Sequence, residues 1–156
     1  MANKRLVTKL SKGLIAIFTL IFILIVLIRS LDYRSNIAIN WGVKLPKNYE
    51  ITYSADSGSG PFNDGFRLHV FYYKNGINTS FLNDFSDKKD KAMEEEVNNI
   101  LSHLEIDPEE SVDFNQPYKW KRITYIPEGG IDIVTKGLYL IYQPQNNCLY
   151  VVDYKI

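Results

Sequence analysis

The feature that most constrains this chain is an uncharged apolar run near its start, residues 13–28, set between Lys12 and Arg29. A helix of sixteen residues is about 24 Å long, and the hydrocarbon core of a bilayer is about 30 Å thick. The aliphatic stems of Lys12 and Arg29 can extend the run toward both headgroup layers. The run has no polar stripe of the kind that a helix in a soluble core shows. We therefore expect a transmembrane anchor over residues 13–30.

The charges on either side of the run predict its orientation. Residues 1–12 carry four basic residues and no acidic one, whereas the basic residues behind the run, Arg29 and Arg34, are partly offset by Asp32. A basic flank stays in the cytoplasm. Residues 1–12 are therefore predicted to be a cytoplasmic tail, and the residues after the anchor to lie outside the plasma membrane. A cleaved secretory signal is the alternative, but no good pair of small residues precedes a cleavage point.

The formal net charge of zero conceals an asymmetry between the two ends of the chain. Residues 1–34 hold six Lys or Arg and one Asp, which gives +5. Residues 35–156 hold twelve Lys or Arg and seventeen Asp or Glu, which gives −5. An acidic outer portion is a poor match for the phosphates of nucleic acid. Nucleic-acid binding is therefore not expected.

The outer portion, about 120 residues, is long enough for one domain with its own core. Cys148 is the only cysteine, so an internal disulfide is impossible. A small exported domain without disulfides, in a chain rich in Asn, Lys, Ile and Tyr, favours a bacterial source. Residues 31–48 are predicted to be a tether, and residues 49–156 an extracytoplasmic domain.

Five strands of this domain are predicted from aromatic and branched residues between turn signals, over residues 49–55, 66–74, 118–126, 137–143 and 148–154. Residues 131–134 are a candidate for a further short strand. Asn75-Gly76 favours a type I′ hairpin turn, which would return residues 77–82 beside residues 66–73. Apolar residues at helical spacing predict one helix over residues 87–104, with Asp87 and Asp90 in its first turn. The fold class is α+β: a five- or six-stranded antiparallel sheet with one helix covering a single face.

The most unusual loop is the glycine-rich stretch over residues 56–65. Its oxygen-rich side chains could surround an ion, but it lacks the phosphate-loop and EF-hand patterns. We take Asp56 and Asp64 of this loop, with His69 on the following strand, as candidate binding residues. Two separated histidines and one cysteine do not form a zinc pattern, so no metal or cofactor is expected.

The strands are also rich in tyrosine. If the helix covers one face of the sheet, the other face would present tyrosines to a partner, because tyrosine is favoured at binding surfaces. Tyr73 and Tyr139 are the candidates, with ordinary core packing as the alternative.

These features favour a single-pass membrane-anchored binding or interaction protein rather than an enzyme. Its partners would be the lipid bilayer, through residues 13–30, and an envelope protein or a secreted peptide. One alternative is a small cell-envelope hydrolase that uses Asp56, Asp64 or His69. Another is a surface immunity protein or an accessory subunit of a membrane complex.

Overall fold

The computed structural model describes residues 14–15, 17–24, 33–58, 65–125 and 136–155, which fall into two compact units, Met1–Leu45 and Pro46–Ile156. In the first unit, residues 14–15 and 17–24 are helical, and their large apolar side chains are exposed. Within the described residues, no helix combines the length and the apolar character needed to span a bilayer. The predicted anchor, residues 13–30, lies partly outside those residues and stays a prediction.

The predicted tether contains a helix, α2 (Tyr33–Trp41). Gly42 ends α2 with φ +68° and donates its N–H to the carbonyl of Ala38. A left-handed glycine directly after a helix is a common C-terminal stop. The Arg34 side chain also donates to the carbonyl of Leu45, 3.0 Å away, so the segment after α2 is held by the helix itself.

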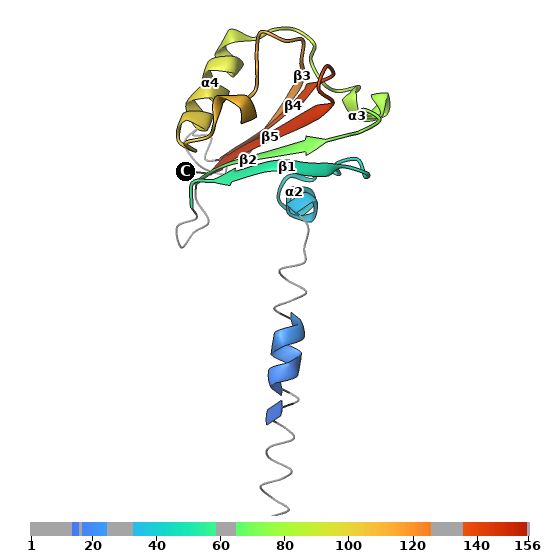
Figure 1. Cartoon of the computed structure of the whole chain (residues 1–156), viewed down its shortest axis with the longest axis vertical. Coiled ribbons are helices and arrows are strands. Elements are labelled where there is room, and N and C mark those ends of the chain that lie inside the picture. The colour runs from blue at the N-terminus through green and yellow to red at the C-terminus, as the bar shows by residue number, and fades with distance from the viewer. Residues whose placement is uncertain (1–13, 16, 25–32, 59–64, 126–135, 156) are drawn as a thin grey trace, which may run out of the picture. The chain divides into compact units, whose positions relative to one another are not determined.

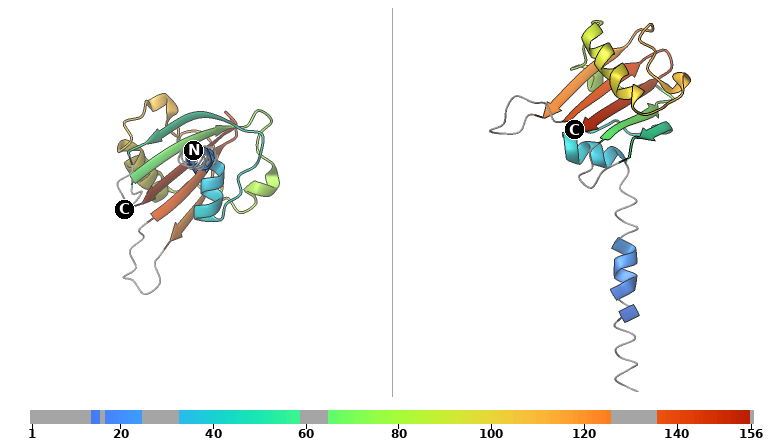
Figure 2. Two further views of the ribbon diagram at one scale, coloured as in Figure 1. Left: turned by 90° about the horizontal axis from the view of Figure 1, so that it is seen from below. Right: turned by 90° about the vertical axis from the view of Figure 1, so that its left-hand side faces the viewer.

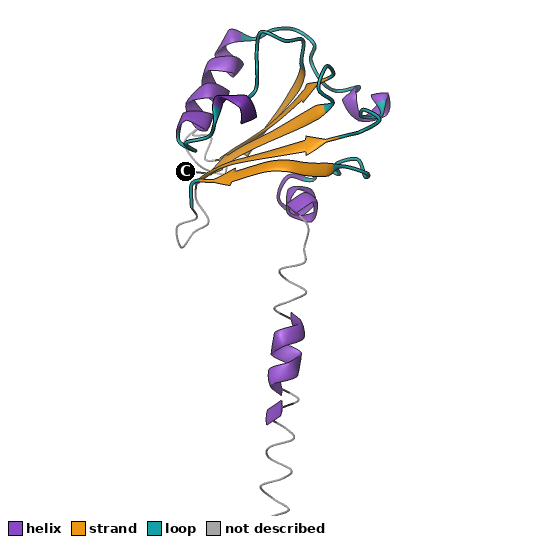
Figure 3. Ribbon diagram, in the orientation of Figure 1, coloured by secondary structure: helices purple, strands orange, loops and turns teal. Residues whose placement is uncertain are grey.

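The second unit is built on an antiparallel sheet in the order β1-β2-β5-β4-β3 (Figures 1 and 3). The strands are β1 (Glu50–Asp56), β2 (Gly65–Tyr72), β3 (Lys119–Tyr125), β4 (Lys136–Gln143) and β5 (Cys148–Lys155). The predicted α+β class with five antiparallel strands is therefore confirmed. The candidate strand over residues 131–134 lies outside the described residues.

The helix α4 (Lys91–Ser102) lies on one side of the sheet in every view (Figures 1 and 2). Its buried residues are Met93, Val97, Ile100 and Leu101, the face that the spacing predicted. They form one core with sheet residues that include Leu68, Val70, Ile141 and Val152. The helix begins at Lys91, four residues after Asp87, because Asp90 is the N-cap: its carboxylate accepts from the N–H groups of Ala92 and Met93.

The predicted return strand over residues 77–82 is wrong. The structure has a short helix there, α3 (Thr79–Leu82), capped by the Asn78 side chain. Both edges of β2 are occupied, one by β1 and the other by β5, so no further strand can pair with it. The turn also differs, since Gly76 has φ +69° while Asn75 is not in the left-handed region that a type I′ turn requires at both positions.

The expectation of a sheet with one open face also fails for the central strands. Seven consecutive residues of β4 and six of β5 are buried, so these strands are covered on both faces. The face opposite α4 carries Phe71, Leu138, Leu140, Leu149 and Val151, all almost fully buried. β4 and β5 carry apolar residues on both faces and lack the alternation of apolar and polar residues that a strand with one solvent-exposed face shows. Such strands are stable when both faces are covered.

Candidate functional site

The predicted residue Asp56 ends β1 and belongs to a charged row that crosses three strands. The strand register places Asp56 opposite Arg67 on β2, and Arg67 opposite Asp153 on β5. The Arg67 guanidinium bonds both carboxylates, at 3.0 Å to Asp56 and 3.4 Å to Asp153. Burial alone would lower the pKa of Arg67, but the charges of Asp153 and Asp56 outweigh it and raise that pKa. This row joins β1, β2 and β5 electrostatically.

His69 lies two residues beyond Arg67 on the same sheet face. Its Nδ1 is 2.8 Å from the hydroxyl oxygen of Ser54 on β1. Burial, with a smaller contribution from the Arg67 charge, lowers the pKa of His69 to about 4, although the Asp56 carboxylate opposes this shift. The imidazole is therefore neutral at neutral pH.

The glycine-rich loop is closed at its base by Ser57. The Ser57 N–H donates to the Phe66 carbonyl at 3.0 Å, and the Ser57 hydroxyl accepts from the Phe66 N–H at 2.9 Å. One oxygen of Asp56 accepts from Gly58 N–H, and the other accepts from Arg67. Asp64 lies outside the described residues. Both carboxylate oxygens of Asp56 are therefore hydrogen-bonded within the domain, to Gly58 and to Arg67. The ring of His69 is hydrogen-bonded to Ser54.

The two candidate tyrosines lie inside the protein. Tyr73 is 2 % exposed, and its hydroxyl donates to the Pro46 carbonyl at 3.4 Å. Tyr139 is fully buried in the core beneath α4, with the Arg122 guanidinium 5.2 Å from its ring centre. Its hydroxyl has no hydrogen-bond partner among the described residues. Neither ring is part of an open sheet face.

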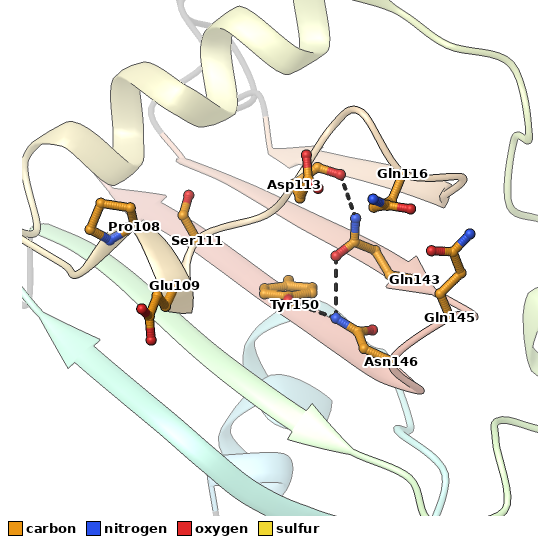
Figure 4. A pocket seen from close by; sticks show the side chains of 9 residues that line it. All are labelled: Pro108, Glu109, Ser111, Asp113, Gln116, Gln143, Gln145, Asn146 and Tyr150. Carbon is orange, nitrogen blue, oxygen red and sulfur yellow. Dashed lines mark hydrogen bonds between the residues drawn. The ribbon is translucent and has the colours of Figure 1, made fainter.

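A hollow lined by described residues lies elsewhere, at the end of the β4–β5 hairpin (Figure 4). Its volume is about 560 Å³. One wall is the segment after α4, which begins with the short 3-10 helix η1 (Pro108–Glu110), and the other wall is the hairpin. The lining residues are Pro108, Glu109, Ser111, Asp113 and Gln116 from the first wall, and Gln143, Gln145, Asn146 and Tyr150 from the second.

A chain of side-chain amides holds the two walls together. The Gln143 amide is 2 % exposed and donates to the Asp113 carbonyl at 2.7 Å. The Asn146 amide donates to the Gln143 side-chain oxygen at 3.5 Å and to the Tyr150 hydroxyl at 3.1 Å, as the dashed lines in Figure 4 show. Because Gln143 is buried and bonded at both ends, the floor of the pocket is fixed before a ligand arrives.

The charged residues that line the pocket are acidic. Among the residues that the structure describes, Glu109 and Asp113 are the charged ones that line it. The hydrogen bond from the Asn115 backbone N–H is the largest cause that lowers the pKa of Asp113, followed by bonds from the Gln116 and Asn115 side chains and by the charge of Lys89, so Asp113 stays ionised. Burial raises the pKa of Tyr150, so its hydroxyl stays protonated. A pocket of amides, hydroxyls and two carboxylates can hydrogen-bond a polar ligand that is neutral or positively charged, and it repels anions.

Sequence reasoning treated residues 144–147 only as a turn, and the structure confirms that turn. One feature of the sequence could have pointed to a polar pocket here: a single hairpin holds four amide side chains, Gln143, Gln145, Asn146 and Asn147. That signal could not show the opposite wall, because Asp113 and Gln143 are thirty residues apart and meet only in the folded domain.

Comparisons with protein-family models, with curated proteins and with solved structures found no significant match to this chain. In the residues that the structure describes, no group of three or more His, Cys, Asp or Glu side chains could hold a metal ion. The functional argument therefore depends on the pocket itself.

Proposed function

We propose that this chain is a single-pass membrane protein whose C-terminal domain lies outside the plasma membrane and binds a polar ligand or partner in the pocket between η1 and the β4–β5 hairpin. The observation that carries the binding role is the preformed pocket, whose buried Gln143 amide joins its two walls. Ligand sites are concave, largely preformed and lined by a few fixed polar groups.

The anchor has two supports. The first is the charge pattern of the sequence, with a basic tail ahead of an uncharged apolar run. The second is the surface of the described helical residues 14–15 and 17–24, whose leucine, isoleucine and phenylalanine side chains are 46–69 % exposed. A helix that is apolar all round is stable when lipid or protein surrounds it. The polar outer domain would then be held close to the membrane surface.

Two measurements test the proposal. Protease added to intact cells should digest the C-terminal domain, and its survival until lysis would refute the orientation. The full-length chain, recovered from mildly solubilised membranes with its bound partners, should be compared with Ser111→Phe, which places a ring in the pocket. Ser80→Phe is the matched control, because Ser80 is exposed and does not line the pocket. If a partner is lost from Ser111→Phe but not from Ser80→Phe, the binding role is supported. If the wild type and both variants recover the same partners, the binding role is contradicted.

A further inference from the structure

A second hollow adjoins the pocket along the same wall. Its volume is about 440 Å³, and it shares Pro108, Ser111 and Asp113 with the pocket. Its remaining lining includes three aliphatic residues, Leu101, Ile106 and Val112, of which Leu101 and Val112 belong to the core and Ile106 is half-buried. The two hollows therefore meet along residues 108–113, with amides and carboxylates toward the hairpin and aliphatic side chains toward the end of α4.

The charge of both hollows has one sign. Among the described residues, Glu109 and Asp113 are the charged ones that line them. Lys89 donates to the carbonyl of Phe114, beside Asp113, but lines neither hollow. Residues 35–156 as a whole carry −5. A positively charged group is therefore attracted both by the domain at a distance and by two carboxylates at the hollows themselves.

We propose that the two hollows form one groove that binds an extended cationic, amphipathic peptide. A Lys or Arg side chain would lie near Glu109 and Asp113, and an aliphatic side chain would occupy the hollow formed by Leu101, Ile106 and Val112. The pocket amides would then bond the peptide backbone. This inference rests on the proposed function and narrows its ligand. The aliphatic half of the groove favours a peptide over a neutral sugar, which has no branched apolar side chain to bury there.

The groove is tested with three labelled peptides and the full-length chain in a non-ionic detergent, by fluorescence anisotropy. The first peptide alternates Lys and Leu with Gly spacers, the second replaces Lys by Glu, and the third replaces Leu by Ser. We expect the first peptide to bind, with an affinity that falls as salt is added. The Glu peptide should not bind, and the Ser peptide should bind about tenfold more weakly because it buries no aliphatic side chain.

Variants separate the two halves of the groove. The double variant Glu109→Gln, Asp113→Asn should weaken binding of the Lys-Leu peptide by about tenfold. Glu95→Gln is the matched control, because Glu95 is an exposed carboxylate of α4 that lines neither hollow. Ile106→Ser should reduce the preference for the Leu peptide over the Ser peptide and leave the salt dependence unchanged. Thermal unfolding of each variant verifies that it is folded.

Equal binding of the Glu and Lys peptides, or an equal loss in Glu95→Gln and in the double variant, would overturn the inference. Binding of a neutral oligosaccharide in place of all three peptides would overturn the ligand class. If no peptide binds while Ser111→Phe still loses a partner, the inference fails and the proposed function stands. If no peptide binds and Ser111→Phe keeps every partner, both fail.

Discussion

Acid should destabilise this domain through His69, and the structure sets the direction and size of the effect. The imidazole is half-buried beside Ser54, and burial with the nearby Arg67 charge lowers its pKa to about 4 against the partial opposition of Asp56. The ordinary pKa of histidine, about 6.5, applies in the unfolded chain. The folded protein therefore resists a proton that the unfolded chain accepts.

The sign follows from proton linkage. Above pH 6.5 both states carry a neutral His69, and the full stability is present. Between pH 6.5 and about 4 the unfolded chain binds more protons than the folded one, so the free energy of unfolding falls as the pH falls. Below about pH 4 both states are protonated at this residue and the loss is complete. A shift of this size corresponds to about 3 kcal/mol at most, and solvent around the half-buried ring reduces it to about 1–3 kcal/mol.

The assay is urea unfolding of the wild type and of His69→Asn between pH 7.5 and pH 4, followed by intrinsic fluorescence. Asparagine keeps a polar atom near Nδ1, where Ser54 bonds, but does not titrate. Carboxylates that do not interact with His69 titrate alike in both proteins and cancel in the difference. We expect the wild type to lose about 1–3 kcal/mol relative to the variant over this range. A difference that stays flat with pH would refute the reasoning.

Three substitutions test the packing, each by denaturant unfolding. Gly137→Ala would place a Cβ 2.5 Å from the ring of Tyr154, so it should cost about 1–3 kcal/mol, and an unchanged midpoint would show that the ring moves freely. Asp90→Ala should lower the free energy of unfolding by about 0.5–2 kcal/mol through loss of the helix cap. Asp87→Ala is its control and should change stability by less than about 0.5 kcal/mol; equal effects would mean that the cap is misplaced. Glu105→Gly should stabilise the domain by about 1 kcal/mol, because residue 105 has φ +48°, and a loss of stability would contradict the assigned strain.

Local signals in the sequence were enough for most of the domain's elements. The helical spacing of Met93, Val97, Ile100 and Leu101 identified the face of α4 that is buried. The strands were found from their aromatic and branched residues, to within a residue or two at each end. These signals work because each depends on neighbours along the chain: a helix repeats every 3.6 residues and a strand every two.

The errors arose where a distant segment decided the outcome. Asn75-Gly76 is a strong local hairpin signal, yet residues 79–82 form a helix. The edges of β2 are taken by β1 and by β5, which begins 76 residues after β2 ends. The helix α4 begins at Lys91 rather than at residue 87, and the hydroxyl of Tyr118, from the segment before β3, accepts the N–H of its cap residue, Asp90. Local propensity cannot register a competitor from another part of the chain.

By itself, the sequence determined the charge asymmetry, the apolar run with its basic flank and the α+β class. These are properties of composition and of short-range periodicity, and they do not depend on which segments meet. Only the tertiary structure decided where a ligand could bind. It gave Asp56 and His69 different hydrogen-bond partners, buried Tyr73 and Tyr139, and built a pocket from two walls that are thirty residues apart. A pocket is a relation between distant segments in space, and only folding establishes that relation.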